Sequence, residues 1–358
     1  NPIGIKIGPD YIDPTYHSVA SGECCRNLDF WGMRDQTLLC QQASVMEKSD
    51  LVIAEGVMGL FDGAATGKSI GSGSTADAAK WLGWPVILVV DARGQGASVT
   101  ALVEGFANHR RDIKVAGVIF NRIGGESHEH ILREALANIN IPCLGCIPRH
   151  DKLTLPNRHL GLIQANEMPL LESWLDEAAK IVANSIDLDL LCKLSVKSER
   201  MSVSNCHPPI PALGKHTAIA FDKAFSFCYQ HVLDAWRAEG VNITFFSPVA
   251  GEIPNSLSDS IYLPGGYPEL YATEISRNHE FKKAMHGAAT NGSVIYGECG
   301  GFMVLGESLT DRDGKSHKML DLLPIKTSFE NPRLHLGYRQ LSLVDRCVLG
   351  DADTKFKG

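Results

Sequence analysis

Short apolar runs rich in β-branched residues recur along the first half of the chain and alternate with segments of helical periodicity. The expected strands are residues 3–7, 51–54, 86–90 and 115–120. The expected helices between them are residues 75–82, 97–109 and 127–139. Apolar strands that alternate with helices are typical of a parallel sheet covered by helices on both faces. We therefore predict a doubly wound α/β domain.

The same alternation returns after a polar stretch, residues 193–215, that contains a proline cluster and has no clear period. Such a stretch is typical of an interdomain linker. A helix at residues 169–191 would close the first domain. Beyond the linker, the expected strands are residues 217–221, 242–246, 260–263 and 293–296, and the expected helices are residues 225–239 and 276–290. The pattern predicts two doubly wound α/β domains, residues 1–192 and 216–358.

Length and charge limit the classes of function. A chain of 358 residues is long enough for two domains of ordinary size. The formal charge is 34 − 41 = −7 and the basic residues are scattered, so we expect no nucleic-acid partner. No stretch approaches the roughly 20 apolar residues that span a bilayer, and residues 1–10 do not resemble a secretory signal. These observations predict a cytoplasmic protein without a membrane partner.

Ten cysteines are spread over the chain without a short repeated spacing, which is typical of reduced thiols rather than of a disulfide framework. Cys143 and Cys146 form one C-x-x-C pair, without a second pair of this kind. Structural zinc sites usually need four ligands. We therefore interpret the pair as part of a core, with a zinc or redox site as the alternative.

Residues 293–305 read as a strand, a glycine-flanked turn and a helix, with Cys299 at the turn. Gly297, Gly300 and Gly301 permit a sharp turn of the kind known as a nucleophile elbow. Backbone N–H groups at the start of the following helix favour a thiolate over a thiol. A buried cysteine in a glycine-rich bend is the alternative, so the assignment depends on what surrounds the turn.

A second glycine motif supports the assignment. Gly265 and Gly266, in the sequence Leu-Pro-Gly-Gly, end another expected strand, where backbone N–H groups, with that of Gly300, are candidates for an oxyanion site. Leu-Pro-Gly-Gly and Gly-Glu-Cys-Gly-Gly together resemble class I glutamine amidotransferase domains, in which the cysteine attacks the side-chain amide of glutamine and ammonia is released. That resemblance also implies a histidine base. His335 does not match its motif, so we expect the base beyond Gly358.

Charged side chains gather at the ends of two expected strands in the first domain. Lys6, Asp10 and Asp13 surround the first strand-to-loop turn, and Glu55 and Asp62 follow a later strand. Ligands of open α/β sheets bind outside the carboxyl ends of the strands, where carboxylates can hold Mg²⁺ beside nucleotide phosphates. Solvated loop charges are the alternative for either loop, but the two loops together favour a nucleotide site.

The segments Lys-Ile-Gly-Pro-Asp-Tyr-Ile-Asp-Pro and Glu-Gly-Val-Met-Gly-Leu-Phe-Asp-Gly resemble the cobyrinic acid a,c-diamide synthase family, and the likeness extends over nearly the whole chain. The resemblance implies a P-loop domain like that of dethiobiotin synthetase, followed by a class I glutaminase. It further implies ATP-dependent amidation of the a and c acetate groups of a corrin, through an acyl phosphate that ammonia displaces. The implied partners are ATP, Mg²⁺, glutamine and a corrinoid or related tetrapyrrole carboxylate.

The resemblance also implies roles for particular residues. Asp10 and Glu55 would hold Mg²⁺, and Lys6 would face the phosphates. Asn121, which begins the sequence Asn-Arg-Ile-Gly-Gly, would contact the adenine base. The residues assigned to the substrate side are Tyr11, Ile12, Asp13 and Asp62.

One part of the family pattern is not found in this sequence. The glycine-rich P-loop of the family precedes the strand that carries Lys6, so we expect it before Asn1. Residues 63–69 are no substitute, because they have three residues between their glycines where a P-loop has four. The resemblance therefore implies a chain that is truncated at both ends and inactive by itself.

Related enzymes remain as alternatives. They are cobyric acid synthase, nickel-sirohydrochlorin a,c-diamide synthase and, more distantly, CTP synthase. Cobyric acid synthases share the two-domain plan but not the Met-Gly-Leu-Phe-Asp loop at residues 58–62. A non-enzymatic P-loop scaffold is an alternative of another class, although it would have no use for an elbow at Cys299. The sequence leaves open the metal of the acceptor, the order of amidation and whether the protein forms a homodimer.

Overall fold

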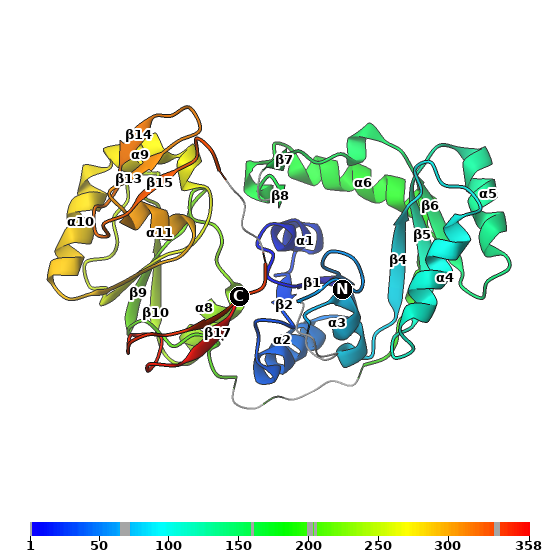
Figure 1. The fold of residues 1–358 in the computed structure, drawn as a ribbon, viewed down its shortest axis with the longest axis horizontal. Coiled ribbons are helices and arrows are strands. Elements are labelled where there is room, and N and C mark those ends of the chain that lie inside the picture. Colours follow the sequence, from blue (N-terminus) through cyan, green and yellow to red (C-terminus); the bar gives the residue numbers. More distant parts are fainter. Residues whose placement is uncertain (1, 65–71, 159–160, 199–202, 204–205, 333–336) are drawn as a thin grey trace. The chain divides into compact units, whose positions relative to one another are not determined.

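The computed structural model describes residues 2–64, 72–158, 161–198, 203, 206–332 and 337–358 (Figure 1). The chain forms two compact units. The first comprises Asn1–Trp31 and Ala43–Ser202, and the second comprises Gly32–Gln42 and Val203–Gly358. Each unit combines parallel strands with helices, so the α/β class predicted from the sequence is confirmed.

The first unit contains two parallel three-stranded sheets. One has the order β2 (Arg26–Leu28), β1 (Pro2–Ile7), β3 (Leu51–Glu55), and the other has the order β4 (Val86–Asp91), β5 (Val115–Ile123), β6 (Cys143–Pro148). A short antiparallel pair, β7 (Asn157–Arg158) and β8 (Gly161–Leu162), follows. Because the strands of each sheet run in parallel, their carboxyl ends meet at one edge, where the expected site residues lie.

The helices of this unit are α1 (Asp13–Ser21), α3 (Thr75–Leu82), α4 (Val99–His109), α5 (Glu126–Leu136), α6 (Leu171–Ser185) and α7 (Leu188–Leu194), with 3-10 turns at Asp151–Leu153 and Ala165–Glu167. Helix α2 (Asp35–Lys48) has residues in both units. Helices α4 and α5 supply Val99, Val103, Leu132 and Leu136 to a core that also contains Val118 and Phe120 of β5. This core fixes the end of β5, which carries Asn121.

The second unit is built on a parallel sheet with the strand order β10 (Asn242–Phe246), β9 (His216–Ala220), β11 (Ser260–Leu263), β12 (Val294–Gly297). Its helices are α8 (Gln230–Ala238), α9 (Ala272–Arg277), α10 (His279–Thr290) and α11 (Gly300–Leu305), with a 3-10 turn at Pro268–Leu270. A small sheet, β14 (Ser316–Lys318), β13 (Ser308–Thr310), β15 (Lys326–Ser328), and the hairpin of β16 (Gln340–Ser342) and β17 (Lys355–Lys357) complete it.

Side chains alternate between the two faces of this sheet, and each face has its own core. Ile261 and Leu263 of β11 pack with Phe281 of α10, whereas Tyr262 between them packs with Trp236 of α8. The period of two along β11 therefore explains why helices cover both faces. The covered sheet holds the ends of β11 and β12 side by side, in parallel register.

Four expected helices were wrong in extent; the one expected at 127–139 ends at Leu136, and the other three are interrupted or begin late. The helix expected at 169–191 is broken between α6 and α7, because Ile186 pairs with Gly145 of β6 and the side chain of Asp187 caps the next helix. The helix expected at 276–290 is preceded by α9, and Asn278 separates α9 from α10 by accepting a hydrogen bond from the Phe281 N–H. The helix expected at 225–239 starts only at Gln230, because the backbone of Phe227 pairs with Gly265.

The expectation that all cysteines are reduced was also wrong for one pair, because the structure joins Cys40 to Cys206 by a disulfide. Two other sequence-based assignments cannot be compared with the structure. Most of residues 63–69, rejected as a phosphate loop, and His335, interpreted as non-catalytic, lie outside the described residues. They remain predictions.

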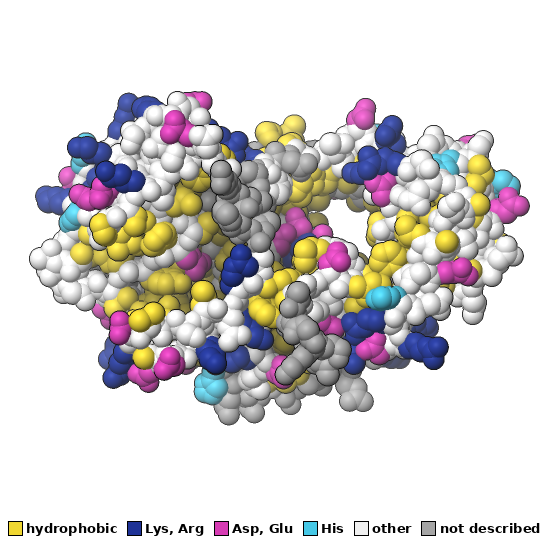
Figure 2. Space-filling model, in the orientation of Figure 1, with side chains coloured by type: hydrophobic (Ala, Val, Ile, Leu, Met, Phe, Trp, Pro, Cys, Tyr) yellow, Lys and Arg dark blue, Asp and Glu magenta, His cyan; other side chains and the backbone are white. Residues whose placement is uncertain are grey.

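Acidic and basic side chains are interspersed over the face of the protein that Figure 2 shows. Hydrophobic side chains are also visible there between the charged ones (Figure 2). Within the part of the chain that the structure describes, no helix has both the length and the apolar composition needed to cross a bilayer.

Candidate active sites

The backbone at Cys299 makes a sharp turn between β12 and α11. Cys299 has a φ of 49° and a ψ of −115°, which is unusual for a residue with a side chain. The glycines around it are required by close approach, because a Cβ at Gly301 would lie 1.9 Å from the Leu263 carbonyl oxygen. A Cβ at Gly297 would lie 2.7 Å from Leu305 Cδ1. The motif therefore folds as the elbow that the sequence predicts.

The Gly265–Gly266 segment lies directly against this elbow. A Cβ built on Gly265 would be 3.0 Å from the Cβ of Cys299 and 3.4 Å from its sulfur. Gly266 has a φ of 155°, and a Cβ there would be 2.1 Å from the Ala224 carbonyl oxygen. Only glycine is compatible with both the backbone conformation and the space at Gly266.

Two backbone N–H groups point toward the sulfur of Cys299. They belong to Gly266 and Gly300, and both donate a hydrogen bond to the Cys299 side chain. The carbonyl oxygen of Gly265 accepts the N–H of Phe227 at 3.0 Å, which fixes the loop. An oxyanion role for the N–H of Gly265 stays a prediction. Two N–H donors beside a nucleophile are the arrangement that stabilises a tetrahedral oxyanion.

Although Cys299 is exposed at the surface, burial of its sulfur by neighbouring atoms raises the pKa of its thiol. The hydrogen bonds from Gly266 and Gly300 act in the opposite direction but are outweighed. The described residues therefore hold Cys299 as a thiol near neutral pH, and a base must remove its proton before it can attack.

Glu298 anchors the elbow from the other side. Its carboxylate accepts hydrogen bonds from the hydroxyls of Tyr262 at 2.6 Å and Tyr296 at 3.3 Å. Burial raises the pKa of Glu298, while the two tyrosine hydrogen bonds lower it in part. Glu298, the residue before Cys299, is therefore held by tyrosines of β11 and β12. The sequence motif did not reveal these interactions.

The second candidate site is an acidic cluster around Lys6 in the first unit. Lys6 and Glu55 are neighbours across β1 and β3, and the Lys6 ammonium lies 3.1 Å from Glu55 Oε1. It lies 2.6 Å from Asp13 Oδ2 and 3.8 Å from Asp10 Oδ2. The structure therefore brings together four of the residues that the sequence predicted for this site.

Electrostatics in this cluster are set by burial and by Lys6. Burial works against the charge of Lys6, but hydrogen bonds and charges from Asp13 and Glu55 raise its pKa above the ordinary value. Burial also disfavours ionisation of Asp13, yet the Lys6 hydrogen bond holds the pKa of Asp13 below its usual value. Burial raises the pKa of Asp10. The lysine thus keeps its positive charge among the carboxylates.

Two residues that the sequence analysis missed complete the cluster. His17 lies on α1, one helical turn after Asp13, and its Nε2 pairs with Glu55 Oε2. Buried Asn27 donates hydrogen bonds to the carbonyl oxygens of Gly8 at 3.0 Å and Asp10 at 2.7 Å, which fixes the loop after β1. Asp13 and His17 are four residues apart, so they lie on the same face of a helix. This spacing could have identified His17 as a site residue, but only if a helix had been predicted there.

The remaining predicted residues lie around or outside this cluster. Ile12 is buried and Tyr11 half-buried in the loop before α1. Asp62 is exposed, and its carboxylate accepts the Gly59 N–H at 3.0 Å within its own loop. Asn121 lies on the other sheet, where its side-chain oxygen accepts the N–H of Arg122 at 2.8 Å.

The chemistry of the cluster fits Mg²⁺ bound together with a nucleotide. Among the described residues, no group of three potential ligands is arranged to hold a metal ion by itself. Mg²⁺ in nucleotide sites, however, usually takes one or two carboxylates together with phosphate oxygens and water. Asp10 and Glu55 provide such oxygens next to the positive charge of Lys6.

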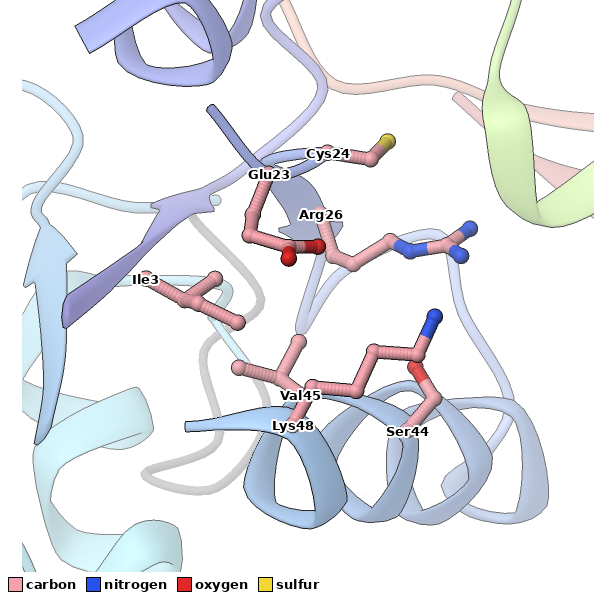
Figure 3. Close-up of a pocket in the computed structure, with 7 residues that line it drawn as sticks. All are labelled: Ile3, Glu23, Cys24, Arg26, Ser44, Val45 and Lys48. Carbon is pink, nitrogen blue, oxygen red and sulfur yellow. The ribbon is translucent and has the colours of Figure 1, made fainter. Parts of the chain in front are cut away.

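A pocket elsewhere in the first unit is separate from this chemistry. Its lining residues, shown in Figure 3, are Ile3, Glu23, Cys24, Arg26, Ser44, Val45 and Lys48. Ile3 lies near the amino end of β1, whereas Lys6 lies toward the carboxyl end. In Figure 3 the charged ends of Arg26 and Lys48 lie toward the same side of the pocket. We assign no role in amidation to this pocket.

Comparisons with known proteins assign family models to two parts of the chain. Residues 216–357 match the CobB/CobQ-like glutamine amidotransferase domain, and residues 32–157 match an AAA domain. These matches, with the Cys299 elbow, define the chain as a glutamine amidotransferase that carries a nucleotide-binding domain.

Curated relatives define the family. The chain is 48% identical over 340 residues to the hydrogenobyrinate a,c-diamide synthase of Rhizobium meliloti, covering 95% of this chain and 78% of the relative. It is 49% identical over 342 residues to that of Brucella anthropi, with the same coverage of both chains. Identity to that of Rhodobacter capsulatus is 44% over 339 residues, 95% of this chain and 77% of the relative. The chain belongs to the a,c-diamide synthase family, as the sequence motifs predicted.

Proposed function

We propose that the full-length protein, through the two sites carried by this chain, performs the ATP- and glutamine-dependent amidation of the a and c acetate carboxylates of hydrogenobyrinate, a step of cobalamin biosynthesis. The observation that carries the proposal is the joint presence of a cysteine elbow with two N–H donors and a Lys6-centred carboxylate cluster. The relatives named above carry the substrate in their names, which favours hydrogenobyrinate over cobyrinate and over a nickel tetrapyrrole.

At the glutaminase site, the sulfur of Cys299 attacks the side-chain amide carbon of glutamine after a base has taken the thiol proton. The N–H groups of Gly266 and Gly300 stabilise the negative charge that develops on the amide oxygen. The C–N bond breaks, ammonia leaves, and water then hydrolyses the thioester to glutamate. We expect the base to be a histidine.

At the synthetase site, an oxygen of the substrate carboxylate attacks the γ-phosphorus of ATP, the bond to the β-phosphate oxygen breaks and ADP leaves. Ammonia then attacks the carbonyl carbon of the acyl phosphate, and phosphate leaves as the amide forms. Lys6 would offset the charge of the transferred phosphoryl group. Asp10 and Glu55 would hold Mg²⁺, which would supply positive charge beside the transferred phosphoryl group. We further assign Asn121 to the adenine base. The substrate side is assigned to Tyr11, Ile12, Asp13 and Asp62.

Isotope transfer tests the proposed function. The full-length protein is incubated with ATP, Mg²⁺ and glutamine labelled with ¹⁵N in its side-chain amide, in parallel with hydrogenobyrinate, cobyrinate or nickel-sirohydrochlorin. Mass spectrometry should show two labelled nitrogens in the a,c-diamide of hydrogenobyrinate, formed faster than either other product. Preferred amidation of the nickel tetrapyrrole would replace this substrate assignment while leaving the two-site chemistry intact.

The proposal includes three expectations that the sequence raised. They are the use of ATP with Mg²⁺, a cytoplasmic location and a homodimer. The AAA-domain match supports a nucleotide-binding domain in the chain. The use of ATP with Mg²⁺ is tested by measuring activity with other nucleotides in place of ATP, and after Mg²⁺ has been removed by a chelator. Analytical ultracentrifugation of the full-length protein tests the oligomeric state.

A further inference from the structure

A bulge in β6 places two cysteine sulfurs beside each other. Residues three apart in a regular strand point to opposite faces. In β6, however, Cys143 pairs with Val118 and Gly145 pairs with the next residue of β5, Ile119, so Leu144 is an extra residue. Cys143 and Cys146 therefore share one face, and their sulfurs lie 4.0 Å apart.

The two thiols differ in access to solvent. Cys146 is only 3% exposed and belongs to the core beneath α4 and α5, whereas Cys143 at the start of β6 is half-buried against the same core. An external reagent can therefore reach Cys143 far more easily than Cys146. An accessible thiol next to a shielded one is the usual arrangement of an attacking and a resolving cysteine.

The electrostatic environment also indicates that Cys143 is the attacking thiol and Cys146 the resolving thiol. The hydrogen bond from Cys146, together with the nearby guanidinium of Arg133, lowers the pKa of Cys143 to about 7. The interaction with Cys143 and burial raise the pKa of Cys146. The lowered pKa of Cys143 favours its thiolate, which is the form that attacks disulfides.

A metal site explains the pair less well. Two thiolates supply half of the four ligands of a typical zinc site. Among the residues that the structure describes, no third histidine, cysteine or carboxylate completes a ligand group with them. Arg133, which acts on both sulfurs, would also be repelled by a bound cation. The geometry is better suited to thiol chemistry between the two cysteines.

We propose that Cys143 and Cys146 form a thiol–disulfide exchange site that small-molecule disulfides such as glutathione disulfide oxidise. The thiolate of Cys143 attacks one sulfur of the glutathione disulfide, forms a mixed disulfide and releases one glutathione thiolate. Cys146 then loses its proton and attacks the Cys143 sulfur, which releases the second glutathione and closes the intramolecular disulfide. Two thiols are oxidised and one disulfide is reduced to two thiols, so atoms and electrons balance.

Peptide mapping tests this site directly. The full-length protein is treated with glutathione disulfide at neutral pH, free thiols are blocked with N-ethylmaleimide, and peptides are analysed by mass spectrometry. The peptide containing Cys143 and Cys146 should lose two hydrogens and carry no glutathione. Exposed Cys192, which serves as the internal control, should acquire glutathione instead.

Single variants test the order of attack. Cys146→Ser should accumulate a stable glutathione adduct on Cys143, several-fold faster than on Cys192. Cys143→Ser should leave Cys146 unmodified, and Cys192→Ser should leave the pair unchanged. Alanine variants of both cysteines repeat the test in case a serine disturbs the core. The proposal is overturned if the pair stays reduced while Cys192 reacts, or if Cys146 reacts as fast as Cys143.

Discussion

The two candidate sites hold their reactive groups by different means. At the elbow, the functional atoms are a sulfur and backbone N–H groups, and they are placed by glycines that tolerate no side chain. At the Lys6 cluster, the functional atoms are side-chain charges, and they are held by one another across two strands and a helix. The glutaminase site is therefore sensitive to shape, and the synthetase site to charge.

This difference predicts which substitutions each site tolerates. Adding a single methyl group at the elbow should abolish its function although no charge changes. Exchanging an oxygen for an NH₂ group should damage the cluster although its shape is kept. Nitrogen-source assays separate the two effects, because added ammonium salt replaces the glutaminase but not the synthetase.

The largest expected effect is that of Gly266→Ala. A methyl group there would lie 2.1 Å from the Ala224 carbonyl oxygen and would force the loop away from Cys299. Because loss of one oxyanion donor costs about 10² to 10³ in rate, we expect glutamine-dependent amidation to fall by about 10³-fold. Ammonium-dependent amidation should be unchanged.

The matched control is Gly287→Ala on α10, where a Cβ would meet no atom within 4 Å. It should retain glutamine-dependent activity to within about twofold. Equal activity of the Gly266 and Gly287 variants would show that the elbow is not placed by the close contacts described above.

Glu55→Gln should have the next largest effect. The substitution keeps the shape of the side chain but removes the charge that lies 3.1 Å from Lys6 and beside His17. We expect a loss of about 10² to 10³ in rate with glutamine and with ammonium salt alike. Glu47→Gln, on the exposed side of α2, is the charge-matched control and should be neutral. A loss confined to the glutamine reaction would contradict the assignment of Glu55.

His17→Asn should give a smaller effect of a different kind. His17 reaches Glu55 from α1, and a Cβ on Gly4 would be 3.0 Å from the Cβ of His17, so this side chain packs closely over β1. Loss of a residue that orients a metal ligand typically costs 10- to 100-fold in metal affinity. We expect the Mg²⁺ concentration for half-maximal activity to rise by about tenfold.

Direct Mg²⁺ binding by calorimetry, in the presence of a non-hydrolysable ATP analogue, should show the same shift for the His17 variant. His130→Asn is the control, since the side chain of His130 is 82% exposed on α5. An unchanged Mg²⁺ dependence in the His17 variant would restrict His17 to packing.

The smallest expected effect concerns the thiol of Cys299. Its raised pKa means that less thiolate is present at any given pH than in an unperturbed cysteine. Alkylation of Cys299 in the 358-residue chain by iodoacetamide should therefore be a few-fold slower near pH 7 than alkylation of a short cysteine peptide. It should increase as pH rises, with a midpoint above that of the peptide. A midpoint below it would show that the N–H groups outweigh burial.

Local patterns in the sequence were sufficient for much of both sites. Strand β1 contains Lys6, β3 ends at Glu55 and β12 ends two residues before Cys299. All three lie in apolar runs followed by glycine or carboxylate motifs, which can be recognised within a short segment of sequence. The two glycine motifs, at residues 264–266 and 297–301, predicted the sharp turn at Cys299 and the glycine segment that lies against it. Both features depend on backbone conformation and close approach. The α/β class followed from the same alternation.

The rest depended on contacts between distant residues. The break at Ile186 arises because β6 offers a backbone partner more than 40 positions earlier in the chain. Strand β6 itself was missed because its apolar run is interrupted by a glycine. His17, Asn27 and the tyrosine partners of Glu298 act through neighbours that only the folded chain supplies. Periodicity cannot report such partners, because it is a property of a single segment.

The structure and the family assignment together place a glutaminase nucleophile and a separate carboxylate-activating site on one chain. The most direct test is the Cys299→Ala variant of the full-length protein, assayed for a,c-diamide formation with glutamine and, separately, with ammonium salt. We expect no detectable glutamine-dependent product and an ammonium-dependent rate within about twofold of the unmodified protein, because the synthetase does not use the thiol. Equal loss of both activities, or glutamine-dependent amidation that survives the substitution, would show that Cys299 is not the nucleophile of a separate glutaminase site.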